Sequence, residues 1–207
     1  EKYPDDYRFV DYDLQELIAK LNTVSSNAML QNWSNCNQIF LRYFSVIFLL
    51  QNNQPIKANA VQALAENKIT RISLYDSLKT YKKLSLFPAK YATQQSFAES
   101  LVFNADDDEY GINKVIFLSE KIIEVEGKKS KFYFYKMIYG EEDEPQYLLS
   151  AAGPFSLNIK DLSTKETEGF IYDEENFHET KLKEQMDALI QQIKDHAKYR
   201  KDNTDAD

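Results

Sequence analysis

The chain has 207 residues, a net charge of −8 at pH 7, and a hydrophobic share of 43%. At this length about 70% of the unfolded surface is buried on folding, so a stable fold requires neither a disulfide nor a metal. The negative charge, with only four arginines among the basic residues, disfavours nucleic-acid binding, because neutralising phosphates requires a basic surface.

Residues 1–105 are predicted to form an all-helical region. Its first ten residues are polar and are expected to be an extended lead-in. Apolar residues then recur at i, i+3, i+4 and i+7, which predicts one buried stripe on a short helix: Leu14, Leu17, Ile18 and Leu21. A turn is expected at residues 25–27. Short turns join the further helices and favour antiparallel packing; these helices are predicted over residues 28–50, 56–66, 70–81 and 89–103.

Residues 55–103 carry a family resemblance. The run IKANAVQALAENKITRISLYDSLKTYKKLSLFP is followed by AKYATQQSFAESLVF, so a helix with small residues precedes a longer amphipathic partner. This pattern resembles successive helices of HEAT-type α-solenoid repeats and covers about a quarter of the chain. The resemblance implies that the helical region is the C-terminal end of a longer array of stacked helical repeats.

An acidic linker over residues 106–112 is predicted to separate this region from a second domain over residues 113–200. The apolar period there becomes two, which indicates an antiparallel meander of four to five strands. Gly127 marks the expected hairpin turn over residues 126–130, and Gly153-Pro154 is expected to end a strand because proline cannot donate to the ladder. Strands are predicted over residues 114–118, 121–126, 131–139, 147–152 and 169–172.

An amphipathic helix capped by Asp173 is predicted to close the second domain, and residues 201–207 are expected to be a disordered tail. Its apolar stripe comprises Leu182, Met186, Leu189, Ile190, Ile193 and Ala197. Such a stripe requires an apolar surface, most simply one face of the sheet. The predicted fold class is therefore α+β, with a bundle or solenoid-like set of about five α-helices followed by an antiparallel meander and a closing helix.

Motifs for catalysis and for cofactor binding are incomplete. Cys36 is the only cysteine, which excludes an intrachain disulfide and CxxC zinc sites. His178-Glu179 begins like a zinc-peptidase HExxH motif, but Leu182 occupies the position of the second histidine. Asp106 begins a sequence like a calcium loop, but Phe117 stands where a bidentate glutamate is required. We therefore predict no catalytic residue, no metal ligand and no cofactor.

The alternation along residues 132–139 gives the sheet two apolar faces. One interpretation is that the closing helix and the helical region cover both faces. The other is that one face carries a partly exposed strip that binds a peptide or a protein partner, because tyrosine offers a large contact area at low entropic cost. The candidate binding residues are Tyr133, Tyr135, Met137 and Tyr139, together with Trp33.

Three functional hypotheses follow. The first is a non-catalytic protein-interaction or scaffold piece, forming the C-terminal part of a longer helical-repeat protein. The alternative is a ligand- or peptide-binding module with a cleft between helices and sheet, and the third is a carboxylate-based hydrolase, since 33 acidic residues offer many pairs. We expect a protein partner, no nucleic acid and no transmembrane segment. The chain is expected to be soluble, either cytoplasmic or exported with its leader removed, and its oligomeric state stays open.

Overall fold

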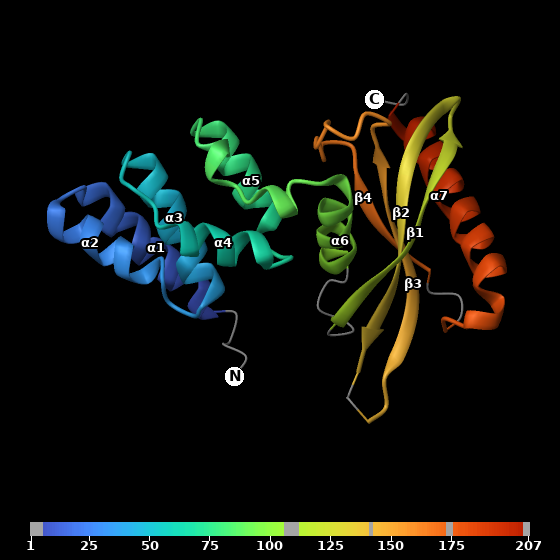
Figure 1. Cartoon of the computed structure of the whole chain (residues 1–207), viewed down its shortest axis with the longest axis horizontal. Helices are drawn as coiled ribbons and strands as arrows, with labels where there is room; N and C mark the ends of the chain where they lie inside the picture. Colours follow the sequence, from blue (N-terminus) through green and yellow to red (C-terminus); the bar gives the residue numbers. More distant parts are fainter. Residues whose placement is uncertain (1–5, 106–111, 141–142, 173–175, 205–207) are drawn as a thin grey trace. The chain divides into compact units, whose positions relative to one another are not determined.

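The computed structural model describes residues 6–105, 112–140, 143–172 and 176–204, with the side chains of residues 6–11 and 201–204 left aside. The chain divides into two compact units, Glu1–Tyr91 and Ala92–Asp207. Helices come first and an antiparallel sheet with a closing helix follows (Figure 1), which confirms the predicted α+β fold class. None of the described helices is both long enough and apolar enough to cross a membrane.

The first unit is helical. The lead-in prediction is wrong from residue 6 onward, where the first helix already begins, and the helix predicted over residues 28–50 is two helices separated by residues 34–38. The α-helices of this unit are α1 (Asp6–Leu21), α2 (Val24–Trp33), α3 (Ile39–Gln51), α4 (Ala58–Glu66) and α5 (Arg71–Thr80). Two 3-10 turns, η1 (Leu84–Leu86) and η2 (Ala89–Tyr91), end the unit.

A capping box explains why α2 begins before the predicted turn at residues 25–27. The Thr23 hydroxyl accepts a hydrogen bond from the Ser26 amide at 3.1 Å, and the Ser26 hydroxyl accepts one from the Thr23 amide at 2.8 Å. These reciprocal bonds satisfy donors that a helix start otherwise leaves without partners. The serines therefore initiate a helix instead of interrupting one.

Only one of the four residues in the predicted apolar stripe of α1 is buried. Ile18 is buried, whereas Leu14, Leu17 and Leu21 are exposed, with Leu17 at 60%. Gln15 is buried in their place, and its amide Nε2 donates to the Leu41 carbonyl at 3.0 Å and to the Ser45 hydroxyl at 3.1 Å. These polar contacts with α3 fix the rotation of α1, which leaves an uncovered row of leucines.

The second unit is a four-stranded antiparallel sheet with one helix on each face (Figure 1). The strand order is β1-β2-β3-β4, so β1 and β4 are the edges. Its elements are α6 (Gln94–Asn104), β1 (Ile112–Val125), β2 (Lys128–Tyr139), β3 (Gln146–Phe155), β4 (Glu168–Tyr172), the 3-10 turn η3 (Glu179–Lys181) and α7 (Leu182–Thr204). Helix α6, which the sequence analysis grouped with residues 1–105, thus packs on the sheet.

Strands β1, β2 and β3 are longer than predicted, and β2 begins at Lys128 because the turn predicted over residues 126–130 has only two residues. The segments expected over residues 114–118 and 121–126 form the single strand β1, whose pairing register with β2 shifts between Phe117 and Ser119. Strand β3 continues through Gly153-Pro154 to Phe155, so the prediction that this dipeptide ends the strand is wrong. The β1–β2 turn has two residues, Glu126 and Gly127, with φ values of 51° and 77°.

The closing helix packs on the sheet as its apolar stripe predicts. Met186, Leu189 and Ile193 are buried against alternate residues of the strands. The shared cluster also contains Ile123, Phe132, Phe134, Leu149, Ala151, Tyr172 and Phe177. Helix α7 begins at Leu182 and continues to Thr204, so the predictions that Asp173 caps it and that a disordered tail begins at residue 201 are wrong. Asp173 itself, most of the predicted linker, residues 106–111, and residues 205–207 lie outside the described residues.

Helix α6 approaches the other face of the sheet closely because β4 carries a glycine at the contact. A Cβ atom at Gly169 would lie 2.6 Å from the Leu101 carbonyl oxygen and 2.8 Å from the Ala105 Cβ. Both neighbours belong to the end of α6 and cannot rotate away. Any side chain at position 169 must therefore push α6 off the sheet.

We predict that Gly169→Ala lowers the free energy of unfolding of the second unit by about 2 kcal/mol, the usual cost of overpacking a filled interior. Urea unfolding followed by far-ultraviolet circular dichroism measures the change, while the fluorescence of Trp33 follows the helical unit. The matched control is Gly127→Asn, because a Cβ at Gly127 meets nothing within 4 Å and asparagine tolerates its positive φ. Equal stability of the two variants would contradict the close approach of α6.

Candidate functional site

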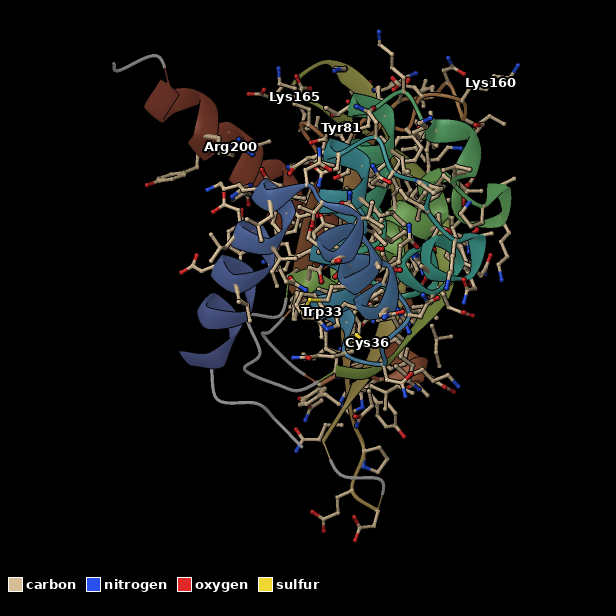
Figure 2. The ribbon with its side chains drawn as sticks, turned by 90° about the vertical axis from the view of Figure 1, so that its left-hand side faces the viewer. Trp33, Cys36, Tyr81, Lys160, Lys165 and Arg200 are labelled. Carbon is tan, nitrogen blue, oxygen red and sulfur yellow. The ribbon has the colours of Figure 1, made fainter. Side chains whose placement is uncertain are left out.

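The structure brings four of the five predicted binding residues together beneath α6. Tyr133, Tyr135, Met137 and Tyr139 lie on the β2 face opposite α7, and all four are buried. They do not form an exposed strip, and the structure instead covers both faces of the sheet. The fifth residue, Trp33, is half-buried in the helical unit, beside Cys36 in the connection between α2 and α3 (Figure 2).

Two tyrosine hydroxyls fix the start of α6 over β2. Tyr133 Oη donates to Gln94 Oε1 at 3.1 Å, and Tyr135 Oη donates to the Gln95 carbonyl oxygen at 2.7 Å. A buried hydroxyl without an acceptor would destabilise the fold by about 1–3 kcal/mol, so both bonds constrain where the helix lies. Thr93 caps the helix, with its hydroxyl accepting from the Ser96 amide.

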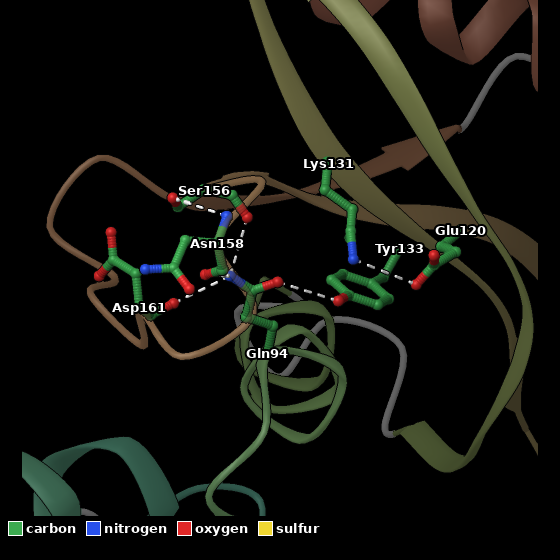
Figure 3. Close-up of polar contacts among 7 residues, drawn as sticks. All are labelled: Gln94, Glu120, Lys131, Tyr133, Ser156, Asn158 and Asp161. Carbon is green, nitrogen blue, oxygen red and sulfur yellow. Dashed lines mark hydrogen bonds and ion pairs between the residues drawn. The ribbon is translucent and has the colours of Figure 1, made fainter.

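Gln94 also holds a loop of the chain that lies far away in sequence. Its Nε2 lies 2.9 Å from the Ser156 carbonyl oxygen, 3.1 Å from that of Asn158 and 2.9 Å from that of Asp161. The side chain is only 2% exposed, so these contacts are shielded from water. Figure 3 shows Gln94 between Tyr133 of the sheet and the loop formed by residues 156–161. One amide side chain thus joins α6, β2 and the β3–β4 loop.

These contacts enclose a hollow beside the first two strands, which we call the α6–loop hollow. Its volume is about 510 Å³. The sheet contributes three polar residues, whereas the loop contributes Lys160 and two aliphatic residues, of which Ile159 is 67% exposed and Leu162 is half-buried. The lining residues are Ala92, Thr93, Gln94, Gln95, Glu120, Lys131, Tyr133, Ile159, Lys160 and Leu162. The surface inside the hollow is more apolar than polar, although most of the lining residues carry a polar group.

The polar centre of the hollow is an ion pair beside an aromatic ring. Lys131 is 9% exposed, and its Nζ lies 3.6 Å from Glu120 Oε2 and 5.8 Å from the centre of the Tyr133 ring. Burial of an ammonium group is costly unless a counter-charge and a polarisable surface compensate for the lost water. Glu120 and Tyr133 provide both, which accounts for a lysine in the interior of the sheet (Figure 3).

The Tyr133 phenol is held in its neutral form. Burial, together with the nearby Glu120 carboxylate, raises the pKa of Tyr133 to about 12. A phenol of this kind donates a hydrogen bond to Gln94 and does not act as a base near neutral pH. Glu120 is the single carboxylate among the lining residues that the structure describes, whereas a two-carboxylate hydrolase requires a facing pair. Burial also raises the pKa of Asp76, but this residue lies on α5 in the other unit.

An edge strand adjoins the hollow. The two-residue turn makes Val125–Lys128 a hydrogen-bonded pair, and such pairs alternate with non-bonded ones along an antiparallel ladder. The backbone N–H and C=O groups of Glu120, Ile122 and Glu124 therefore point away from β2. In the parts of the chain that the structure describes, no strand pairs with this side of β1.

Two apolar side chains of β1 are exposed on the same face as the hollow. Ile122 is 62% exposed and Phe117 is 40% exposed. Phe117 also contacts the buried tyrosines, with ring centres 6.4 Å from Tyr133 and 5.8 Å from Tyr135. The exposed edge and the hollow thus form one continuous candidate surface along β1 and β2.

Sequence reasoning did not identify Gln94, Glu120 or Lys131. A glutamine in the first turn of a polar-faced helix carries no signal of its own, because its role depends on a loop more than sixty residues away. Lys131 does carry a signal, since it begins the strand predicted over residues 131–139 and is followed by four aromatic residues. A lysine at a position that alternation assigns to a covered face requires a partner.

Comparisons with protein-family models, with curated proteins and with solved structures found no match for this chain. Across the described residues, no three side chains of His, Cys, Asp or Glu converge in a way that would hold a metal ion. The geometry of the α6–loop hollow and of the β1 edge is accordingly the basis for a functional proposal.

We predict that Tyr133 is the tyrosine whose titration step lies near pH 12, against an ordinary value of 10.0. Because the folded pKa lies above the unfolded one, the stability from this group is complete below pH 10 and is lost as the pH rises toward 12. The difference in tyrosinate absorbance between the wild type and Tyr133→Phe isolates the step. If the titration step that Tyr133→Phe lacks lies near pH 10 instead of pH 12, the Tyr133 phenol is not buried.

Proposed function

We propose that the chain is a non-catalytic protein-interaction module whose second unit binds an extended segment of a partner protein by strand addition to β1. The observation that carries this proposal is the outer edge of β1, where the backbone groups of Glu120, Ile122 and Glu124 point away from the sheet. An edge strand with unpaired N–H and C=O groups is a template for another strand.

The exposed apolar surface beside this edge supports the proposal. Strand addition gains affinity from main-chain hydrogen bonds and specificity from side-chain pockets on one face of the sheet. Ile122 and Phe117 offer apolar contacts at the edge, and the α6–loop hollow offers a pocket close to Glu120. The chemistry of the hollow favours binding over catalysis, because its lysine is paired and its phenol is neutral.

This proposal combines the interaction hypothesis with the peptide-binding alternative from the sequence. The pocket lies between α6 and the sheet inside the second unit, so it does not require a cleft involving the helical unit. That the helical region ends a longer array of HEAT-type repeats stays a prediction. The uncovered leucines of α1, Leu14, Leu17 and Leu21, are the surface that a further helix would cover.

A displayed library of random peptides tests the proposed function. We expect the wild-type chain to enrich extended, β-forming sequences, and Ile122→Pro to lose about tenfold or more in affinity for them, because proline removes an outward N–H while leaving the β1–β2 ladder intact. The matched control is Ile122→Thr, which keeps the amide and is expected to bind within about threefold of the wild type.

The fold of the proline variant is checked by its unfolding midpoint. If that variant is unfolded, Glu124→Pro replaces it, since the amide of Glu124 also points outward. Selected peptides that bind a folded proline variant as tightly as the wild type would rule out strand addition at this edge. Failure to enrich any peptide would count against the interaction function as a whole.

A further inference from the structure

We propose that the segment recognised by β1 is basic, with a lysine or arginine two residues before and two residues after an apolar residue. This inference rests on the proposed function, since it specifies the chemistry of the same edge. Glu120, Ile122 and Glu124 alternate along β1 and therefore present their side chains on one face of the sheet. A strand paired with this edge places its own alternate residues directly opposite them.

Exposure makes the two carboxylates available to a partner. The side chain of Glu120 is 56% exposed, and Glu124 and Ile122 are exposed as well. Residues directly opposite each other on paired strands have Cβ atoms about 4.5–5.5 Å apart, and opposite charges there attract while like charges repel. The partner strand that suits all three positions has an apolar residue opposite Ile122 and a basic residue opposite each of the two glutamates.

The lysines on β2 oppose this preference but lie farther away. Lys129 pairs with Glu124, and Lys131 pairs with Ile122 and contacts Glu120 at 3.6 Å. An added strand lies one strand spacing beyond β1, so it is about 10 Å from β2, which is close to the Debye length at physiological salt. The directly opposed glutamates therefore dominate. Because Lys131 partly neutralises Glu120, we expect Glu124 to contribute more of the selectivity.

The face of the sheet that α7 covers does not change the preference for a basic partner segment. Lys121 and Ile123 point toward α7, and the Nζ of Lys121 lies 5.7 Å from the centre of the Phe134 ring. Partner residues opposite these positions face α7 and not the two glutamates. The preference for basic residues in the partner strand therefore comes only from the face of the sheet that carries Glu120, Ile122 and Glu124.

Three synthetic peptides test the inference. They share one β-forming sequence and differ only at two positions around a central valine: Lys-Thr-Val-Thr-Lys, Gln-Thr-Val-Thr-Gln and Glu-Thr-Val-Thr-Glu. We expect the lysine peptide to bind the full chain about fivefold more tightly than the glutamine peptide, and the glutamate peptide to bind most weakly. Added salt is expected to reduce these differences, because the charges are exposed.

Variants of the chain locate the effect. We expect the double variant Glu120→Gln/Glu124→Gln to bind the lysine and glutamine peptides within about twofold of each other, and Glu124→Gln alone to remove more of the preference than Glu120→Gln. The matched control, Glu144→Gln/Glu184→Gln, removes the same charge from exposed positions away from the edge and is expected to keep the preference.

The outcomes separate this inference from the proposed function. If all three peptides bind equally and Ile122→Pro weakens each of them, strand addition stands and the basic preference is wrong. Tighter binding of the glutamate peptide would also overturn the inference and would show that Lys129 and Lys131 dominate. If Ile122→Pro changes the binding of none of the peptides, both the inference and the proposed function fail.

Discussion

The second unit depends on the burial of two tyrosine hydroxyls under α6. Tyr133 and Tyr135 present large rings to the interior, and each hydroxyl requires an acceptor there. The acceptors are Gln94 and Gln95, so the first turn of α6 is fixed over β2. With its carbonyl oxygen engaged, Gln94 has its amide nitrogen directed at the β3–β4 loop. The position of the hollow follows from these contacts.

The same packing leaves β1 only partly covered. Helix α6 packs mainly on β3 and β4, where Gly169 permits contact with Leu101 and Ala105, and less on β1. Long edge strands with exposed apolar residues tend to pair with other chains, and charged side chains on the edge limit such pairing. Glu120, Lys121 and Glu124 limit indiscriminate pairing while permitting a partner of complementary charge.

Much of the fold was predictable from local patterns. The stripe from Met186 to Ile193 predicted a helix docked on the sheet, and Gly127 predicted the hairpin. Alternation along β2 indicated two apolar faces but left open whether both are covered. The placement of α6 was not predictable, because it follows α5 through short 3-10 turns and its partners on β3 and β4 lie about fifty residues or more away.

The candidate site was harder to predict for the same reason. Tyr133 and Tyr135 were recognised as unusual, but their burial depends on α6. Gln94 carries a role that only the folded chain reveals. The outward direction of Ile122 depends on the two-residue length of the turn at Glu126, which sets the hydrogen-bonding alternation along all of β1.

Amide hydrogen exchange in the free chain, resolved residue by residue along β1, tests the central claim that this edge is unpaired. An unpaired edge predicts fast exchange at Glu120, Ile122 and Glu124, at rates close to those of an unfolded peptide, and slow exchange at Lys121 and Ile123, whose amides bond to β2. Slow exchange at all five positions would show instead that the outer edge of β1 is already covered.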